Sequence, residues 1–185
     1  MRIEVHLHGS VPLRPGVTLA QVEAALRALL EYIDEDNLAD ARSVYEDEPG
    51  IVFDPKEKLL DICWSGDVGR NFKEHVSGAL GALNSFAERA SEIEVTYYHD
   101  DGTDEYQLIF VGPTPESIHE AQRQAMIDDV SAVLARQFGD TEIGEVVALI
   151  NQLFLRSSPS DAGRAVAAAA AAQAPMSPQH RKRLH

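Results

Sequence analysis

The sequence is poor in cysteine, in basic residues and in long apolar runs, and each shortage excludes a class of protein. Its 185 residues include one cysteine, Cys63, so no disulfide can form within the chain, and a reducing cytoplasm is the expected compartment. No apolar run reaches the roughly 20 residues that a membrane-spanning helix needs, and no secretory signal precedes the first strand pattern. We therefore expect a cytoplasmic protein without membrane contact.

Basic residues are few, with 16 lysines and arginines against 30 aspartates and glutamates. Residues 156–185 hold five of the basic residues and one acidic residue, a net charge of +4, so residues 1–155 carry a net charge of −18. An acidic body of this kind repels nucleic-acid phosphates and attracts basic proteins. We expect no direct nucleic acid binding by this body, and a basic protein is the partner that its charge favours.

The first part of the chain predicts a strand followed by a helix. Residues 2–8 alternate between apolar and polar, which is typical of a strand with one buried face. Thr18 and Gln21 have the spacing of a capping box, and an apolar stripe at helical spacing follows them. The helix is expected to end near an acidic cluster at 34–36.

The middle of the chain predicts two strands and a second helix. The strands lie within residues 42–64, and 59–64 is the stronger of them. The pattern leaves open whether 51–53 pairs with that strand or continues the preceding one. Asp67 is the expected N-cap of a long helix, whose buried stripe extends to Ala90.

The last part predicts a hairpin and two helices. Residues 93–99 and 105–111 alternate on either side of a short Asp/Gly segment, as in a β-hairpin. Thr114 is the expected cap of the next helix, because Pro115 then occupies the favoured first helical position. A shorter amphipathic helix covers 143–154.

Together these elements predict an α+β domain. Strand–helix–strand occurs twice, in 2–47 and 58–99, which is the βαββαβ pattern of a ferredoxin-like core, and the last hairpin strand adds to its edge. The predicted division is an α+β sheet domain at 1–113, a helical pair packed on the same domain at 114–155, and a flexible alanine-rich tail with a basic end at 156–185.

Helices cover one face of such a sheet and leave the other face open. The strand pattern places eight mostly polar side chains on this open face: Glu4, His6, His8, Asp61, Cys63, Glu94, Thr96 and Tyr98. Either the helical pair or a second copy of the protein would cover them.

Two histidines of the first strand, His6 and His8, are candidate metal ligands. Strand alternation places both imidazoles on one side of the sheet, where a divalent ion can share them. The five residues from His6 to Ser10 resemble the opening motif of the metal-dependent amidohydrolases, adenosine deaminases among them, which implies a metal-dependent hydrolase. That family is built on a (β/α)₈ barrel of about 250 residues, whereas this chain predicts hairpins. Hydrolysis at the His6/His8 pair is therefore the alternative hypothesis.

Two further constellations involve the same histidines. Cys63 becomes a nucleophile only with a base nearby, and His6 or His8 across the sheet is the candidate base. A wider metal site that adds His99 and Asp100 is disfavoured, because antiparallel pairing of the first and fourth strands puts His99 at the opposite end from His8.

Two acidic clusters in predicted turns are the candidate interaction residues: Glu46, Asp47 and Glu48, and Asp100 and Asp101. Such a surface fits an acidic antagonist of a basic protein, whose association would weaken as salt is added. The favoured prediction is a non-catalytic protein without a cofactor that acts through protein–protein contact. A homodimer, formed through the open face or the helical pair, is one form of that contact.

Overall fold

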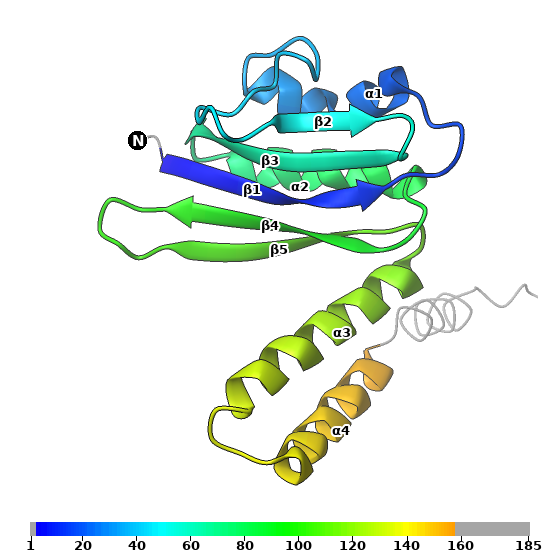
Figure 1. The fold of residues 1–185 in the computed structure, drawn as a ribbon, viewed down its shortest axis with the longest axis vertical. Coiled ribbons are helices and arrows are strands. Elements are labelled where there is room, and N and C mark those ends of the chain that lie inside the picture. The colour runs from blue at the N-terminus through cyan, green and yellow to red at the C-terminus, as the bar shows by residue number, and fades with distance from the viewer. Residues whose placement is uncertain (1–2, 158–185) are drawn as a thin grey trace, which may run out of the picture.

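A five-stranded antiparallel sheet organises the structure, a computed structural model that describes residues 3–157 (Figure 1). The strand order is β2-β3-β1-β4-β5, with β1 paired to both β3 and β4. In chain order the elements are β1 (Ile3–Pro12), α1 (Leu19–Tyr32), β2 (Gly50–Asp54), β3 (Leu59–Val68), α2 (Phe72–Ala82), a 3₁₀ turn (Leu83–Ser85), β4 (Ser91–Tyr98), β5 (Glu105–Val111), α3 (Pro115–Leu134) and α4 (Asp140–Arg156). The α+β class is confirmed, and the ferredoxin-like assignment of its core stays a prediction.

The hydrophobic core lies between one face of the sheet and the helices α1 and α2, which pack on that face (Figure 1). Every strand contributes to this core, as expected for an α+β domain with one covered face. Its largest fully buried side chains are Tyr97, Phe72, Leu7, Leu13, Leu26, Leu29, Leu30, Ile51, Leu60, Ile62, Leu80 and Leu83. Among the described residues, no helix has the length and apolar character that a bilayer crossing requires.

The predicted helix starts are confirmed where the signal is local. The Thr18 side chain accepts a hydrogen bond from the Gln21 backbone N–H, and the Gln21 side chain accepts one from the Thr18 N–H at 2.9 Å. Thr114 forms the same reciprocal pair with Ser117, and Pro115 follows it at the first helical position. Each cap satisfies backbone N–H groups that would otherwise lack a partner.

The strand predicted before residue 47 is wrong, because the second strand begins only at Gly50. Gly50 has φ +85, and a Cβ atom there would lie 2.4 Å from the Ala41 carbonyl oxygen, so the chain turns sharply where glycine alone fits. The backbone before this turn is held by its neighbours: the Trp64 indole N–H donates to the Arg42 carbonyl at 3.0 Å. The open question about 51–53 is settled by the pairing of β2 with β3.

The helix predicted to start at Asp67 and reach Ala90 is shorter at both ends. Asp67 belongs to β3, because β1 is long enough to pair as far as Ile3 with Val68. The cross-strand hydrogen bonds gained there override the turn-like composition of the segment. The helix α2 starts at Phe72 and stops at Ala82, where a 3₁₀ turn redirects the chain.

The helices α3 and α4 form a hairpin that extends from the β5 side of the sheet (Figure 1). The two helices pack mainly on each other, and α3 also adjoins β4 and β5, where its middle residues Ala121, Ala125 and Asp129 line a hollow together with Glu94 and Tyr106. Ile150 is the single buried hydrophobic residue of α3 and α4. The predicted tail, 156–185, lies outside the described residues from 158 onward.

Candidate functional site

The open face of the sheet carries the polar side chains that strand alternation predicted. In the register, β1 places His6 opposite Ser65 on one side and Thr96 on the other. His8 lies opposite Cys63 and Glu94 in the same way. The open-face prediction is confirmed by this register, and its histidines occupy the central strand.

Three potential metal ligands converge at this point. The ligand atoms of His6, His8 and Cys63 all lie within 4.8 Å of one another. The two imidazole rings are nearly parallel, with an interplanar angle of 12° and centroids 6.0 Å apart. His8 is exposed, and the other two side chains are half-buried, so solvent reaches the cluster.

A loop from the other side of β3 reaches His6 and orients its ring. Glu48 places Oε1 3.3 Å from His6 Nδ1, and the Ser65 Oγ atom lies 2.9 Å from the same nitrogen. The Ser65 hydroxyl donates to Glu48 Oε1 at 3.1 Å, and the Ser43 hydroxyl also donates to Glu48. The hydroxyl proton of Ser65 is used in its hydrogen bond to Glu48. The Nδ1–H group of His6 is therefore the donor to Ser65 Oγ and Glu48 Oε1, and Nε2 of His6 remains free to bind another group.

This arrangement opens into a shallow hollow of about 470 Å³ on the same face. The hollow is lined by Glu4, His6, Tyr45, Glu48, Ser65 and Tyr98. The Tyr45 hydroxyl donates to Glu4, and this bond to a carboxylate raises the pKa of Tyr45 above its usual value. The hollow therefore presents carboxylates, two phenols and an imidazole to solvent beside the cluster.

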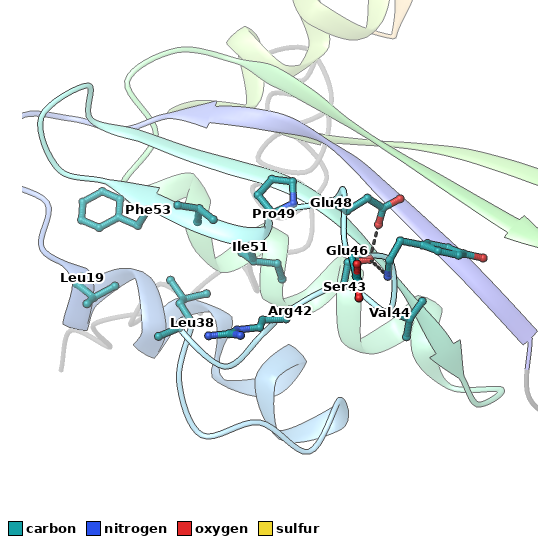
Figure 2. Close-up of a pocket in the computed structure, with 13 residues that line it drawn as sticks. Leu19, Leu38, Arg42, Ser43, Val44, Glu46, Glu48, Pro49, Ile51 and Phe53 are labelled. Atoms are coloured by element: carbon teal, nitrogen blue, oxygen red, sulfur yellow. Dashed lines mark hydrogen bonds between the residues drawn. The ribbon is translucent and has the colours of Figure 1, made fainter.

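A larger hollow, of about 560 Å³, lies on the far side of the same loop, between α1 and β2 (Figure 2). Apolar side chains line much of it, including Leu19, Leu38 and Phe53. Ser43 and Glu48 stand at its edge, where Figure 2 shows their hydrogen bond. The loop that holds His6 is therefore also the wall of this second hollow.

The surroundings of Cys63 keep its thiol protonated. Burial raises the pKa of this thiol, and the nearby carboxylates of Glu48, Asp61 and Asp47 raise it further. A nucleophilic cysteine needs the opposite arrangement, with cations that lower its pKa. The structure thus places Cys63 beside the predicted histidine base in an environment suited to a neutral thiol.

Of the acidic residues predicted to bind a partner, one is half-buried against other side chains of the protein and the rest are exposed. Glu48 is held against His6, whereas Glu46 and Asp47 are both exposed in the adjoining loop. Asp100 and Asp101 lie in the turn between β4 and β5, where Asp101 accepts a hydrogen bond from the Thr103 N–H at 3.0 Å. Both acidic segments lie at the end of the sheet where β1 begins (Figure 1).

His99 follows the β4 residue Tyr98, which pairs with Glu4 and not with the His8 end of β1. The prediction that it lies apart from the His6/His8 pair is confirmed. The sequence places His6, His8 and Cys63 on the open face but does not indicate that Glu48 and Ser65 join them there. Among the described residues, Ser65 is the polar residue that is buried, with 2% of its surface exposed. No pattern in the neighbouring sequence predicts its burial.

Comparison with known proteins places the chain in a family. A model for a family of unknown function, DUF6806, matches residues 3–155, so the chain belongs to that family. No curated protein matches the chain, and no solved structure matches it. The matched range includes α3 and α4, so the helical hairpin is part of the family's common domain.

Proposed function

We propose that the protein is non-catalytic and acts through protein–protein contact, with the α3–α4 hairpin as its contact surface and a second copy of the chain as its first partner. The observation that supports this proposal is the set of large apolar side chains that the hairpin leaves exposed: Met126, Val133, Phe138, Leu149, Leu153 and Leu155. Isolated apolar side chains on a surface need no explanation, whereas a group on one protruding element is typical of an interface.

A two-helix hairpin with one buried residue lacks a core of its own. Helical stability in proteins comes mainly from packing an amphipathic face against another layer. The helix α4 has apolar side chains on the side that faces α3 and also on a second side, where Leu149 and Leu153 are 55% and 52% exposed. A further helical layer would bury this second side.

A second copy fits this requirement better than an occasional partner does. An occasional partner would leave the leucines in water for much of the time, and exposed apolar groups of this kind promote aggregation. A copy of the same chain is present whenever the protein is made. Two hairpins related by a twofold axis would form a four-helix bundle, in which each hairpin covers the apolar side of the other.

The test is a pair of charge substitutions on the exposed side of α4. We expect Leu149→Asp with Leu153→Asp to convert a dimer into a monomer in sedimentation velocity, with the α+β circular dichroism spectrum retained. Leu19→Asp is the matched control, because Leu19 is similarly exposed, at 48%, and lies on α1 away from the hairpin. A monomeric unmodified chain, or a double variant that remains a dimer, would refute the proposal.

The acidic-antagonist form of this function is supported by the placement of the two acidic clusters at one end of the sheet (Figure 1). That end would bind a basic protein while the hairpin holds the dimer. The single free cysteine supports a cytoplasmic site of action. Replacing Glu46, Asp47, Asp100 and Asp101 by the corresponding amides should abolish salt-sensitive capture of a basic protein from the source lysate, and Glu116→Gln with Glu145→Gln is the control on the hairpin.

Metal-dependent hydrolysis by the His6/His8 pair is the second candidate, and the convergence of Cys63 on the pair favours it. It requires a bound ion and turnover. Zinc-loaded protein that hydrolyses none of a panel of activated esters, amides and phosphoesters would eliminate it. The ferredoxin-like description of the core belongs with these proposals, and the pairing of β1 with both β3 and β4 supports it.

A further inference from the structure

We propose that His6, His8 and Cys63 form a binding site for a divalent transition-metal ion of the zinc class. Two imidazoles and one thiol are nitrogen and sulfur donors, which zinc and cobalt prefer and which magnesium and calcium do not. The site does not depend on the hairpin contact proposed above, so each proposal can fail without the other.

The distances are compatible with such an ion. Tetrahedral bonds of about 2.0 Å to nitrogen and 2.3 Å to sulfur place ligand atoms about 3.3 to 3.6 Å apart. The three ligand atoms already lie within 4.8 Å of one another, so small side-chain rotations close the site. The backbone needs no change, because His8 and Cys63 are directly opposite in the β1–β3 register.

The contacts of His6 supply a second, independent observation. Metal-binding histidines usually donate their other ring N–H to a carboxylate or a similar acceptor, which fixes the tautomer and the ring orientation. His6 Nδ1 lies 2.9 Å from Ser65 Oγ and 3.3 Å from Glu48 Oε1. Ser43 in turn donates to Glu48, so the orienting carboxylate is itself held in place. Glu48 and Ser65 are positioning residues in this proposal.

The charge and exposure of the face define the kind of site. Carboxylates of Glu4, Glu48 and Glu94 surround the cluster on the same face and favour a cation there. Three protein ligands leave a fourth position, and the exposure of His8 opens that position to solvent. Sites with three protein ligands and one exchangeable ligand bind water or a small substrate at the ion, unlike closed structural zinc sites.

Cobalt titration of the purified full-length chain, reduced and free of chelators, is the test. We expect one Co²⁺ per chain, with the visible bands of tetrahedral cobalt and the near-ultraviolet thiolate-to-cobalt band, and displacement of both by Zn²⁺. Cys63→Ser should abolish the thiolate band, and His8→Ala should abolish the tetrahedral bands. His99→Ala is the control that keeps both, because His99 lies outside the cluster.

Glu48→Gln separates a positioning role from a ligand role. It should keep the cobalt spectrum and weaken the affinity by about tenfold, the lower end of the effect of losing such an outer partner. Circular dichroism of each variant shows whether it has folded. Absence of saturable cobalt binding by the unmodified chain, or cobalt binding by that chain without a thiolate band, would overturn the proposal.

Discussion

The environment of Tyr97 predicts that the protein becomes less stable at alkaline pH. Tyr97 lies on β4 beneath α2 and is 1% exposed. Its hydroxyl donates to Gln107 Oε1 at 3.2 Å, and its ring contacts Phe72 edge to face. Burial raises the pKa of Tyr97 from 10.0 to about 12, and the charge of Glu105 adds to the effect. A neutral phenol is therefore favoured in the folded state far above the pH at which the unfolded chain ionises.

The sign of the effect follows from proton binding. Below pH 10 the phenol is protonated in both states, so this group does not make stability pH-dependent. Between pH 10 and 12 the unfolded chain releases the proton and the folded protein retains it, so the free energy of unfolding falls as pH rises. With those two pKa values, the loss by pH 11 is about 1.4 kcal/mol.

The assay is urea unfolding of the unmodified chain, Tyr97→Phe and the control Tyr98→Phe across this pH range. Tyr97→Phe should be less stable by about 1 kcal/mol at neutral pH, because Gln107 loses its partner. It should also lose about 1.4 kcal/mol less than the unmodified chain between neutral pH and pH 11. Tyr98 is 42% exposed on the open face, and its variant should decline like the unmodified chain. Identical pH dependence of the unmodified chain and Tyr97→Phe would refute the reasoning.

Three substitutions test the packing of the sheet and the helices. Gly66→Ala should destabilise the fold by about 1–3 kcal/mol, since its Cβ would lie 2.6 Å from the Trp64 ring, and the tryptophan emission should shift as the indole moves. Gly78→Ala should stabilise by about 0.5–1 kcal/mol in thermal unfolding, because the position is an exposed helix interior with no atom within 4 Å of the added methyl group. Thr114→Ala should cost about 1 kcal/mol in urea unfolding by removing the α3 cap, and Thr114→Ser should restore it. Unchanged stability of Gly66→Ala, lower stability of Gly78→Ala, or unchanged stability of Thr114→Ala would contradict the reasoning for that substitution.

Features set by neighbours in the sequence could be predicted from the sequence. The Thr18 cap depends on Gln21 three residues later, and the β4–β5 hairpin depends on two alternating runs and the turn between them. Strand alternation was enough to place His6 and His8 on the open face. In each case the interacting groups are close in the chain, so a local pattern contains the physical cause.

Features set by distant partners could not be predicted in this way. Asp67 is a residue type that commonly caps helices, but it pairs with Glu4 and so belongs to β3. This pairing depends on the length of β1, which the residues near Asp67 do not indicate. Glu48 reaches His6 across 42 positions, through a loop whose path depends on the Gly50 turn and on Arg42. Tertiary pairing overrides local preference at such positions, and the polar cluster of the open face is one of them.

The exposed hairpin shows the same limit in another form. The apolar stripes of its sequence correctly predict two helices. Such a stripe does not indicate which surface of the protein, or of a partner, will bury it. In the structure α3 and α4 cover each other only in part, with one buried hydrophobic residue between them. The remaining apolar side chains are the basis of the proposed contact function, and their exposure depends on how the two helices pack.

The mass of the unmodified protein tests this account most directly. Native mass spectrometry at micromolar concentration, with light scattering on the same sample, measures it without any substitution. The hairpin contact predicts a dimer of twice the 20.3 kDa chain mass, which dissociates on dilution into species that bind a hydrophobic dye more strongly. A 20.3 kDa monomer that persists at high concentration, stays folded and does not aggregate would contradict the proposed dimer. The apolar side of the hairpin would then be stable in contact with water.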